Sequence, residues 1–331
     1  MSAALLEVDG LGVRLPVDGR MLPVLHDVSL SIAPGESLGL VGESGSGKSM
    51  TARAIARLLP PGAETTGAIR FDGGDVNALR GAALRNLRVE VATIFQDPRA
   101  HVNPVRTIGD FMAEALRTLH GVPPAEARRR AIAALADVGI DDGERRLRQY
   151  PHELSGGLLQ RVMIAAMLLG EPRLVLADEP TTALDVTTQA EVMAILDELR
   201  RERGMALLFI THDLDLAGAV CDRTAVMYAG QIVETRASAL LHDDPLHPYS
   251  ATLATARPTI DAAVHRLAAI PGRPVSAFEA PAGCAFAPRC AHARDACRAA
   301  RPPAEPLDGG VVRCIRATEL RGRLAELVHH A

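Results

Sequence analysis

Residues 42–49, GESGSGKS, constrain the fold of this chain more than any other stretch. They match the pattern G-x-x-x-x-G-K-[ST], in which glycines let the backbone curl until successive N–H groups point at phosphate oxygens. An apolar run at residues 37–41 precedes the pattern, and a run of helical periodicity at residues 49–59 follows it. The positive end of such a helix attracts phosphate. The sequence therefore predicts a nucleotide-binding loop in an α/β core.

Lys48 is the only lysine of the chain, because the 36 basic residues comprise 35 arginines and this one lysine. An ammonium is compact and donates in three directions, whereas a guanidinium is planar and forked. We infer that the loop leaves a hole for the small head group beside the β- and γ-phosphates. The residues predicted to bind the nucleotide are Gly42, Glu43, Ser44, Gly45, Ser46, Gly47, Lys48, Ser49 and Met50.

A second motif, LVLADE at residues 174–179, is an apolar strand that ends in two carboxylates. Asp178 is placed to help Ser49 hold Mg²⁺. Glu179 is suited to polarise an attacking water as general base. Because the phosphate-binding pattern is already present, a nucleotide-hydrolysing site explains this pair better than a solvated turn does.

Strands and helices alternate along most of the chain, which is typical of α/β proteins. Apolar or alternating runs predict strands at 24–32, 174–177 and 206–210, and residues 65–96 are interpreted mostly as strands and turns. Periodicity predicts helices at 124–138 and 188–201, and a helix after residue 107 with Thr107 and Asp110 as cap residues.

The character of the sequence changes near residue 240, where Pro, Ala, Arg and Cys begin to dominate and periodicity fades. We expect a nucleotide-binding domain over residues 1–240, with a helical subdomain at about 97–165. A C-terminal extension then covers residues 241–331.

Composition excludes several classes of function. The net charge is −4 and aromatic residues make up 3% of the chain, so nucleic-acid binding is not expected. No stretch reaches the roughly 18 apolar residues that span a bilayer, and the first residues lack the features of a signal peptide. We expect a cytosolic chain that can dock on a membrane protein.

Residues 154–157 spell LSGG, and Gln160 and Arg161 follow them. With the phosphate-binding pattern and LADEP, this segment resembles the signature of ATP-binding subunits of ABC transporters. Gln96 in IFQDP resembles the Q-loop glutamine, and His212 in FITHD resembles the switch histidine. Residues 183–185, ALD, resemble the D-loop, which ends at Asp185.

The resemblance implies a P-loop NTPase of ABC type, with a RecA-like core, an antiparallel β subdomain and a helical subdomain. It implies that Glu179, His212 and Gln96 are catalytic, and that Mg²⁺ is held through Ser49, Gln96 and Asp178. Two ATPase subunits would face each other head to tail. The residues implied to contact ATP held by the partner subunit are Ser155, Gly156, Gly157 and Gln160.

Further stretches resemble the dipeptide, oligopeptide and nickel importers within this family. They are residues 94–110 (IFQDPRAHVNPVRTIGD), PLHPYS at 245–250, IPGRP at 270–274 and GCAFAPRC at 283–290. The segment after the loop is similar to the D-type subunit of such importers. The implied partners are a homologous second ATPase, two permease subunits and, indirectly, an extracytoplasmic solute-binding protein. The implied location is peripheral, on the cytoplasmic face of the inner membrane.

The C-terminal extension contains Cys284, Cys290, Cys297 and Cys314. A disulfide framework is disfavoured in the cytosol, whereas four thiolates can hold zinc or an iron–sulfur cluster. Some members of the resembled group hold a [4Fe–4S] cluster at such cysteines. A cluster, zinc and metal-free cysteines all remain open, although the spacing lacks the C-x2-C pairs of zinc ribbons.

Three alternatives to peptide import are considered. One is an importer of nickel or another small solute in the same family. Another is a soluble ABC ATPase of DNA repair or translation, but the chain carries no second phosphate-binding pattern and no long insertion. A degenerate, regulatory ATPase site is disfavoured because Glu179 and His212 are both present.

Overall fold

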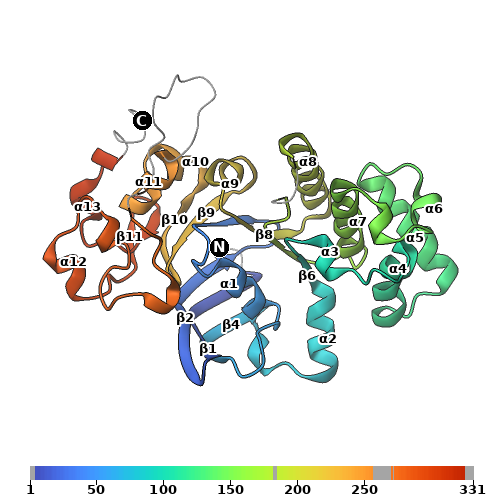
Figure 1. Ribbon diagram of the computed structural model, residues 1–331, viewed down its shortest axis with the longest axis horizontal. Coiled ribbons are helices and arrows are strands. Elements are labelled where there is room, and N and C mark those ends of the chain that lie inside the picture. The colour runs from blue at the N-terminus through green and yellow to red at the C-terminus, as the bar shows by residue number, and fades with distance from the viewer. Residues whose placement is uncertain (1–3, 182–184, 256–269, 271, 325–331) are drawn as a thin grey trace. The chain divides into compact units, whose positions relative to one another are not determined.

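The computed structural model describes residues 4–181, 185–255, 270 and 272–324. The chain divides into two compact units. The first comprises residues 1–32, 37–77 and 209–331, and the second comprises residues 33–36 and 78–208. Both units contain strands and helices (Figure 1), and the predicted α/β class, with parallel and antiparallel strand pairs, is confirmed.

The first unit contains two groups of paired strands. One is an antiparallel sheet in the order β2 (Arg20–Ile32), β1 (Leu6–Val17), β4 (Glu64–Phe71) and β5 (Gly74–Asp75). In the other, β3 (Ser37–Val41) pairs in parallel with β9 (Arg223–Tyr228). Antiparallel pairing then continues through β10 (Gln231–Ala237), β12 (Gly310–Val312) and β11 (Glu305–Leu307). All five residues of β3 are buried, as its continuous apolar run predicts.

The helices of the first unit follow its strands in the chain. Helix α1 begins at Lys48, within the last two residues of the phosphate-binding pattern, so the predicted order of strand, loop and helix is confirmed. The described helices of this unit are α1 (Lys48–Ile55), α9 (Leu214–Val220), α10 (Ser238–Asp243), α11 (Pro248–Thr255), α12 (Asp295–Ala299) and α13 (Ala317–Leu320).

The second unit is mostly helical. Its strands β6 (Val91–Ile94) and β7 (Leu174–Asp178) pair in parallel, and β8 (Ala206–Thr211) runs from this unit into the first. Its described helices are α2 (Gly81–Glu90), α3 (Pro98–His101), α4 (Ile108–Leu119), α5 (Pro124–Asp137), α6 (Gly143–Arg146), α7 (Gly156–Leu168) and α8 (Val186–Arg203).

Helix boundaries in this unit follow local capping chemistry. The Thr107 side chain accepts the Asp110 N–H at 3.1 Å, so the predicted start of α4 is confirmed. Helix α5 ends near Gly139, whose φ of 74° suits a glycine after a helix. The interpretation of residues 65–96 as strands and turns is wrong in part, because α2 occupies residues 81–90. Its only buried residue is Leu87, so the helix has almost no apolar stripe to recognise.

A buried glutamate ties the start of the C-terminal extension to β10. The Glu234 carboxylate accepts the N–H groups of Leu246 at 2.8 Å and His247 at 2.9 Å. Glu234 is fully buried, and the Arg236 guanidinium offsets its charge only in part. Burial therefore raises the pKa of Glu234 to about 7, and burial lowers that of His247 to about 3.

Glu234→Gln is expected to change the pH dependence of stability. The carboxyl of Glu234 has a pKa of 4.5 in an unfolded chain and about 7 in the fold. Between those values the folded chain keeps a proton that the unfolded chain has lost, so rising pH destabilises the parent, by up to about 3 kcal/mol. Glutamine does not ionise, and the His247 contribution is common to both chains. The melting temperature of the variant minus that of the parent should be larger at pH 8 than at pH 5. The same difference in melting temperature at both pH values would contradict the assignment of a raised pKa to Glu234.

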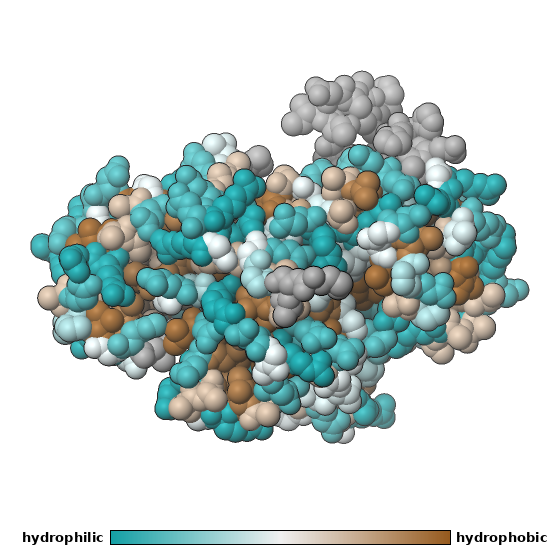
Figure 2. All heavy atoms as spheres, turned by 180° about the vertical axis from the view of Figure 1, so that it is seen from behind, coloured by the Kyte–Doolittle hydropathy of each residue, from teal (hydrophilic) through white to brown (hydrophobic). Residues whose placement is uncertain are grey.

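Hydrophilic side chains predominate on the face of the molecule drawn in Figure 2. Among the described residues, no helix is long and apolar enough to cross a membrane.

Candidate nucleotide site

The phosphate-binding loop encloses its lysine. The Lys48 side chain leaves only 5% of the residue exposed, and its Nζ donates to the carbonyl oxygens of Gly42 at 2.7 Å and Glu43 at 3.1 Å. The ammonium is therefore held inside the curl of the loop backbone. This placement supports the inference that the loop accepts a compact cation.

Two glycines of the loop are required by close contacts. A Cβ at Gly42 would lie 2.1 Å from the Met227 carbonyl oxygen. Gly47 has a φ of 108°, and a Cβ there would lie 2.7 Å from the Leu25 side chain. The loop is thus pressed against β9 and β2, and only glycine fits at these two positions.

Two residues of the C-terminal part of the first unit contact this loop, although no role in nucleotide binding was predicted for either of them. The Tyr249 hydroxyl accepts the Glu43 N–H at 2.9 Å. Arg289 donates to the Glu43 carboxylate at 2.6 Å. They lie 206 and 246 residues away from Glu43 in sequence. Because these residues are so far apart along the chain, a local sequence pattern cannot show that they contact Glu43.

The second unit brings two predicted catalytic residues together. The Gln96 side-chain amide donates to the Glu179 carboxylate at 2.9 Å. Gln96 follows β6 and Glu179 follows β7, and these strands are parallel neighbours, so their carboxyl ends lie at one edge. Glu179 has a φ of 46°, a left-handed conformation that is uncommon outside glycine and that clusters at functional sites.

Asp178 and His212 end strands in their respective units. Asp178 is the last residue of β7 and is 9% exposed. His212 is exposed and follows β8, just before Asp213, whose side chain caps α9 by accepting the Leu216 N–H at 2.8 Å. Both residues thus stand where a strand gives way to a loop, as the apolar runs before them predict.

The signature residues begin α7. The Ser155 side chain caps this helix by accepting the Leu158 N–H at 3.3 Å. A Cβ at Gly157 would lie 2.6 Å from the Thr188 side chain of α8, so glycine permits the close approach of the two helices. An open groove of about 560 Å³ lies there, lined by Gly139, Ser155, Gly156, Gly157, Leu158, Arg161, Asp185, Thr188 and Glu191.

Gln160 does not line this groove. It is 1% exposed on the buried side of α7, and its Nε2 has no hydrogen-bond partner among the described residues. The expectation that Gln160 contacts ATP held by a partner subunit stays a prediction, and the side chain lies on the buried side of α7.

Asp185 lines the same groove and caps helix α8. Its carboxylate accepts the Thr188 N–H at 3.0 Å and the Thr188 hydroxyl at 2.8 Å. These hydrogen bonds, the backbone one first, hold the pKa of Asp185 below its ordinary value. The preceding residues 183 and 184 lie outside the described part of the chain.

The four C-terminal cysteines line one small cavity of the first unit, together with His247, His292 and Arg316. Burial raises the pKa of the Cys284 and Cys290 thiols, and it raises that of Cys314 to about 11. The donor chemistry suits zinc or an iron–sulfur cluster. As the residues stand, however, no three His, Cys, Asp or Glu side chains within the described ranges are placed to hold one metal ion.

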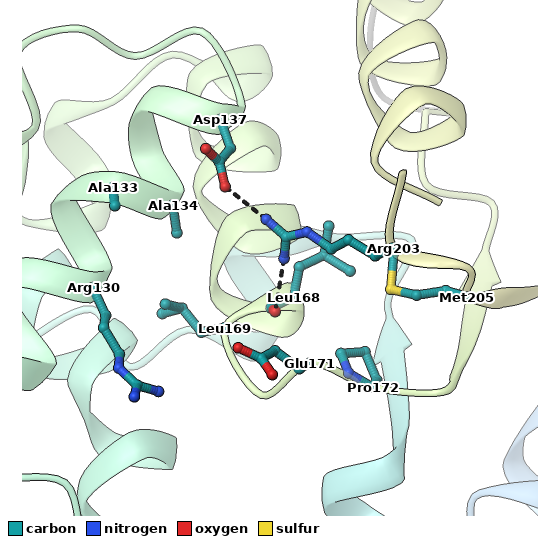
Figure 3. Close-up of a pocket in the computed structure, with 10 residues that line it drawn as sticks. All are labelled: Arg130, Ala133, Ala134, Asp137, Leu168, Leu169, Glu171, Pro172, Arg203 and Met205. Atoms are coloured by element: carbon teal, nitrogen blue, oxygen red, sulfur yellow. Dashed lines mark hydrogen bonds and ion pairs between the residues drawn. The ribbon is translucent and has the colours of Figure 1, made fainter. Parts of the chain in front are cut away.

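A separate cavity in the second unit contains none of the predicted site residues. Arg203 of α8 reaches Asp137 of α5 at 2.6 Å and the Leu168 carbonyl oxygen at 3.2 Å, as Figure 3 shows. The cavity measures about 490 Å³, and Arg130, Leu169 and Met205 also line it. Its ion pair links two helices of the unit, which is a structural role.

Comparison with known families gives two matches along the chain. Residues 25–182 match the family described as ABC transporter. Residues 233–297 match the family described as oligopeptide/dipeptide transporter, C-terminal region. The second match covers Glu234, Tyr249 and Arg289, as well as three of the four clustered cysteines.

Individual relatives span nearly the whole chain. A putative peptide import ATP-binding protein of Brucella abortus is 46% identical over 95% of both chains. The oligopeptide transport ATP-binding protein of Salmonella typhimurium is 41% identical over 95% of this chain and 94% of its own. Among solved structures, a dimeric ATP-binding cassette bound to ADP and phosphate is 28% identical over 70% of this chain and 98% of its own, with a TM-score of 0.63.

Proposed function

This chain belongs to the ABC transporter family, among the ATP-binding subunits of oligopeptide and dipeptide importers, and from that premise we propose that it hydrolyses ATP to drive peptide import through a membrane permease. The observation that carries the substrate class is the match of residues 233–297 to the C-terminal region of peptide transporters. The relatives at 41–46% identity carry names of the same kind.

The residues of the first unit supply phosphate binding. Lys48 is proposed to reach the β- and γ-phosphates, and the backbone N–H groups of residues 42–50 to surround them. Ser49, Gln96 and Asp178 would hold Mg²⁺, which neutralises phosphate charge when bound. His212 is proposed to contact the γ-phosphate and stabilise charge in the transition state.

Glu179 is proposed as the general base. Its carboxylate takes a proton from the attacking water, while the Gln96 amide, 2.9 Å away, orients the carboxylate. The bond between the β–γ bridging oxygen and the γ-phosphorus breaks, the water oxygen bonds to that phosphorus, and the bridging oxygen leaves with ADP. Chemistry of this kind depends on positioning and charge rather than on a covalent intermediate.

A second ATPase subunit is proposed to complete each site. The Ser155 hydroxyl and the N-terminal end of α7 in the open groove suit the γ-phosphate of ATP held by a partner. Gly156 and Gly157 would let that phosphate approach. Closure of the pair on ATP and reopening after hydrolysis would then drive the permease.

The assembly is proposed to sit at the cytoplasmic face of the inner membrane, bound peripherally to two permease subunits. A homologous, distinct second ATPase and an extracytoplasmic solute-binding protein complete the proposed system. We keep the proposed boundary between the nucleotide-binding domain and the extension near residue 240, and the helical subdomain at about 97–165.

Peptide uptake tests the proposed function. The chain, copurified with its second ATPase and permease subunits, reconstituted in liposomes and supplied with the solute-binding protein, should drive accumulation of a labelled di- or tripeptide only with ATP on its own side. The same complex carrying Glu179→Gln is the matched control. Uptake of nickel without peptide would favour the alternative importer, and ATP hydrolysis with no permease association would favour a soluble ATPase.

The four clustered cysteines are proposed to hold a [4Fe–4S] cluster. Their thiol chemistry and their shared cavity support this, and no step of ATP hydrolysis is routed through it. Anaerobically purified protein should contain iron and acid-labile sulfide in equal amounts, about four of each per chain. Zinc in their place would support the zinc alternative, and four titratable thiols without metal would contradict any metal site.

A further inference from the structure

The C-terminal extension contacts Glu43, the second residue of the phosphate-binding loop. Arg289 lies in a short turn between Cys284 and Cys290. Its Nη1 donates to Glu43 Oε2 at 2.6 Å, and its Nη2 donates to Glu43 Oε1 at 3.1 Å. A guanidinium matches a carboxylate in this paired geometry, which fixes orientation as well as distance.

The surroundings of Arg289 hold this pair in one geometry. The Arg289 side chain is 4% exposed, and the Glu43 side chain is 21% exposed. The guanidinium lies 5.8 Å from the centre of the Tyr228 ring and 6.0 Å from that of Phe286, and its Nη1 also donates to the Tyr228 hydroxyl. Exposed ion pairs contribute little because their side chains are free to move, but this pair is largely buried.

The Tyr249 hydroxyl restrains the backbone of the same loop residue. It accepts the Glu43 N–H at 2.9 Å, and its ring packs against Tyr228 at 4.6 Å and Phe286 at 5.2 Å between ring centres. Glu43 is therefore fixed at both its side chain and its N–H by residues of the C-terminal part.

Glu43 in turn helps to place the lysine. Its carbonyl oxygen is one of the two acceptors of the Lys48 ammonium, at 3.1 Å. The other acceptor is the carbonyl of the preceding residue, Gly42, whose peptide bond also carries the restrained Glu43 N–H. A movement of Glu43 would shift both acceptors, and with them the cation that is proposed to meet the phosphates.

We propose that Arg289 is a positioning residue for ATP binding, which acts through Glu43 to hold the phosphate-binding loop in its receptive curl. Arg289 itself does not contact phosphate in this role. The nucleotide affinity of the first unit thus depends on the C-terminal extension. The proposal rests on the proposed assignment of residues 42–50 as the ATP site.

A double-mutant cycle with a matched control tests the proposal. The variants are Arg289→Met, Glu43→Gln and the pair together, in the full chain. Arg273→Met is the control, because Arg273 pairs with Glu279 at an exposed position of the same extension. ATP affinity is measured by titration well below the lowest melting temperature, and kcat and KM are measured in parallel.

Arg289→Met is expected to weaken ATP binding roughly tenfold and raise KM, with kcat at saturating ATP within about twofold of the parent, because substrate and transition state lose the same positioning. Glu43→Gln should have a smaller effect in the same direction, and the double variant should resemble Arg289→Met rather than the product of both. Arg289→Lys should recover part of the loss, and Arg273→Met should change nothing.

The outcomes separate positioning from simple structural support. A fall in melting temperature with unchanged ATP affinity would overturn the proposal, as would single effects that multiply in the double variant. If Arg289→Met does not fold, Glu43→Gln decides, since its unchanged ATP affinity would also overturn the proposal. If the parent chain does not bind ATP, the proposed function fails instead.

Discussion

Glu179→Gln is expected to keep ATP binding and to reduce ATP turnover at least about 100-fold, because general-base catalysis contributes roughly 10²–10⁴ to rate. The amide has nearly the shape of the carboxylate but cannot accept the proton of the attacking water. Gln96 donates to Glu179 Oε2 at 2.9 Å, and the variant can keep that contact through its amide oxygen. The loop at residues 42–50 is not altered, so affinity for ATP should stay within about threefold, or 0.7 kcal/mol.

Glu171→Gln is the matched control for this variant. Glu171 stands a few residues before β7, is exposed, and like Glu179 has a positive φ, of 52°. It lies in the cavity that contains none of the predicted site residues. Turnover is measured as phosphate release, and binding by titration with ATP. A Glu179→Gln chain that hydrolyses ATP at the parent rate would exclude Glu179 as the base. An equal loss of turnover in Glu171→Gln would instead indicate a general disturbance near β7 rather than the loss of the Glu179 carboxylate.

Features that depend on neighbours in sequence are the ones that could be predicted. The curl of residues 42–49 and the Thr107 cap of α4 each involve groups within a few residues of one another. The contact between Gln96 and Glu179 was not predicted. The resemblance implied only that both residues are catalytic, and the parallel pairing of β6 with β7 brings them together.

Features that depend on tertiary burial could not be predicted. Helix α2 has only Leu87 buried, so no apolar stripe marks it. Gln160 is polar, yet its position on α7 turns it to the interior, where its residue type predicts exposure. The contact of Arg289 with Glu43 joins residues 246 apart, and a single arginine among 35 carries no sign of its partner.

Lys48→Arg is expected to be nearly as damaging as Lys48→Ala, with ATP binding or turnover reduced about 100-fold, the scale of losing a charge-assisted contact to a reacting phosphate. The positive charge is kept in the arginine variant, so a site that needed only charge would tolerate it. The Lys48 ammonium, however, is held by the Gly42 and Glu43 carbonyl oxygens at 2.7 and 3.1 Å, and the residue is 5% exposed. The longer, planar guanidinium would have to displace the backbone that forms the site.

Arg53→Lys is the control for Lys48→Arg, because Arg53 is an exposed residue of the same helix, α1, and the exchange there should leave ATP binding and turnover unchanged. ATP affinity, turnover and melting temperature are measured for Lys48→Arg, Lys48→Ala and this control. Full activity in Lys48→Arg would show that the loop requires a positive charge but not the compact shape of the ammonium group. The single lysine of the chain would then reflect composition alone. Loss in Lys48→Arg with an intact melting temperature would instead show that the loop excludes arginine by the size of its enclosure.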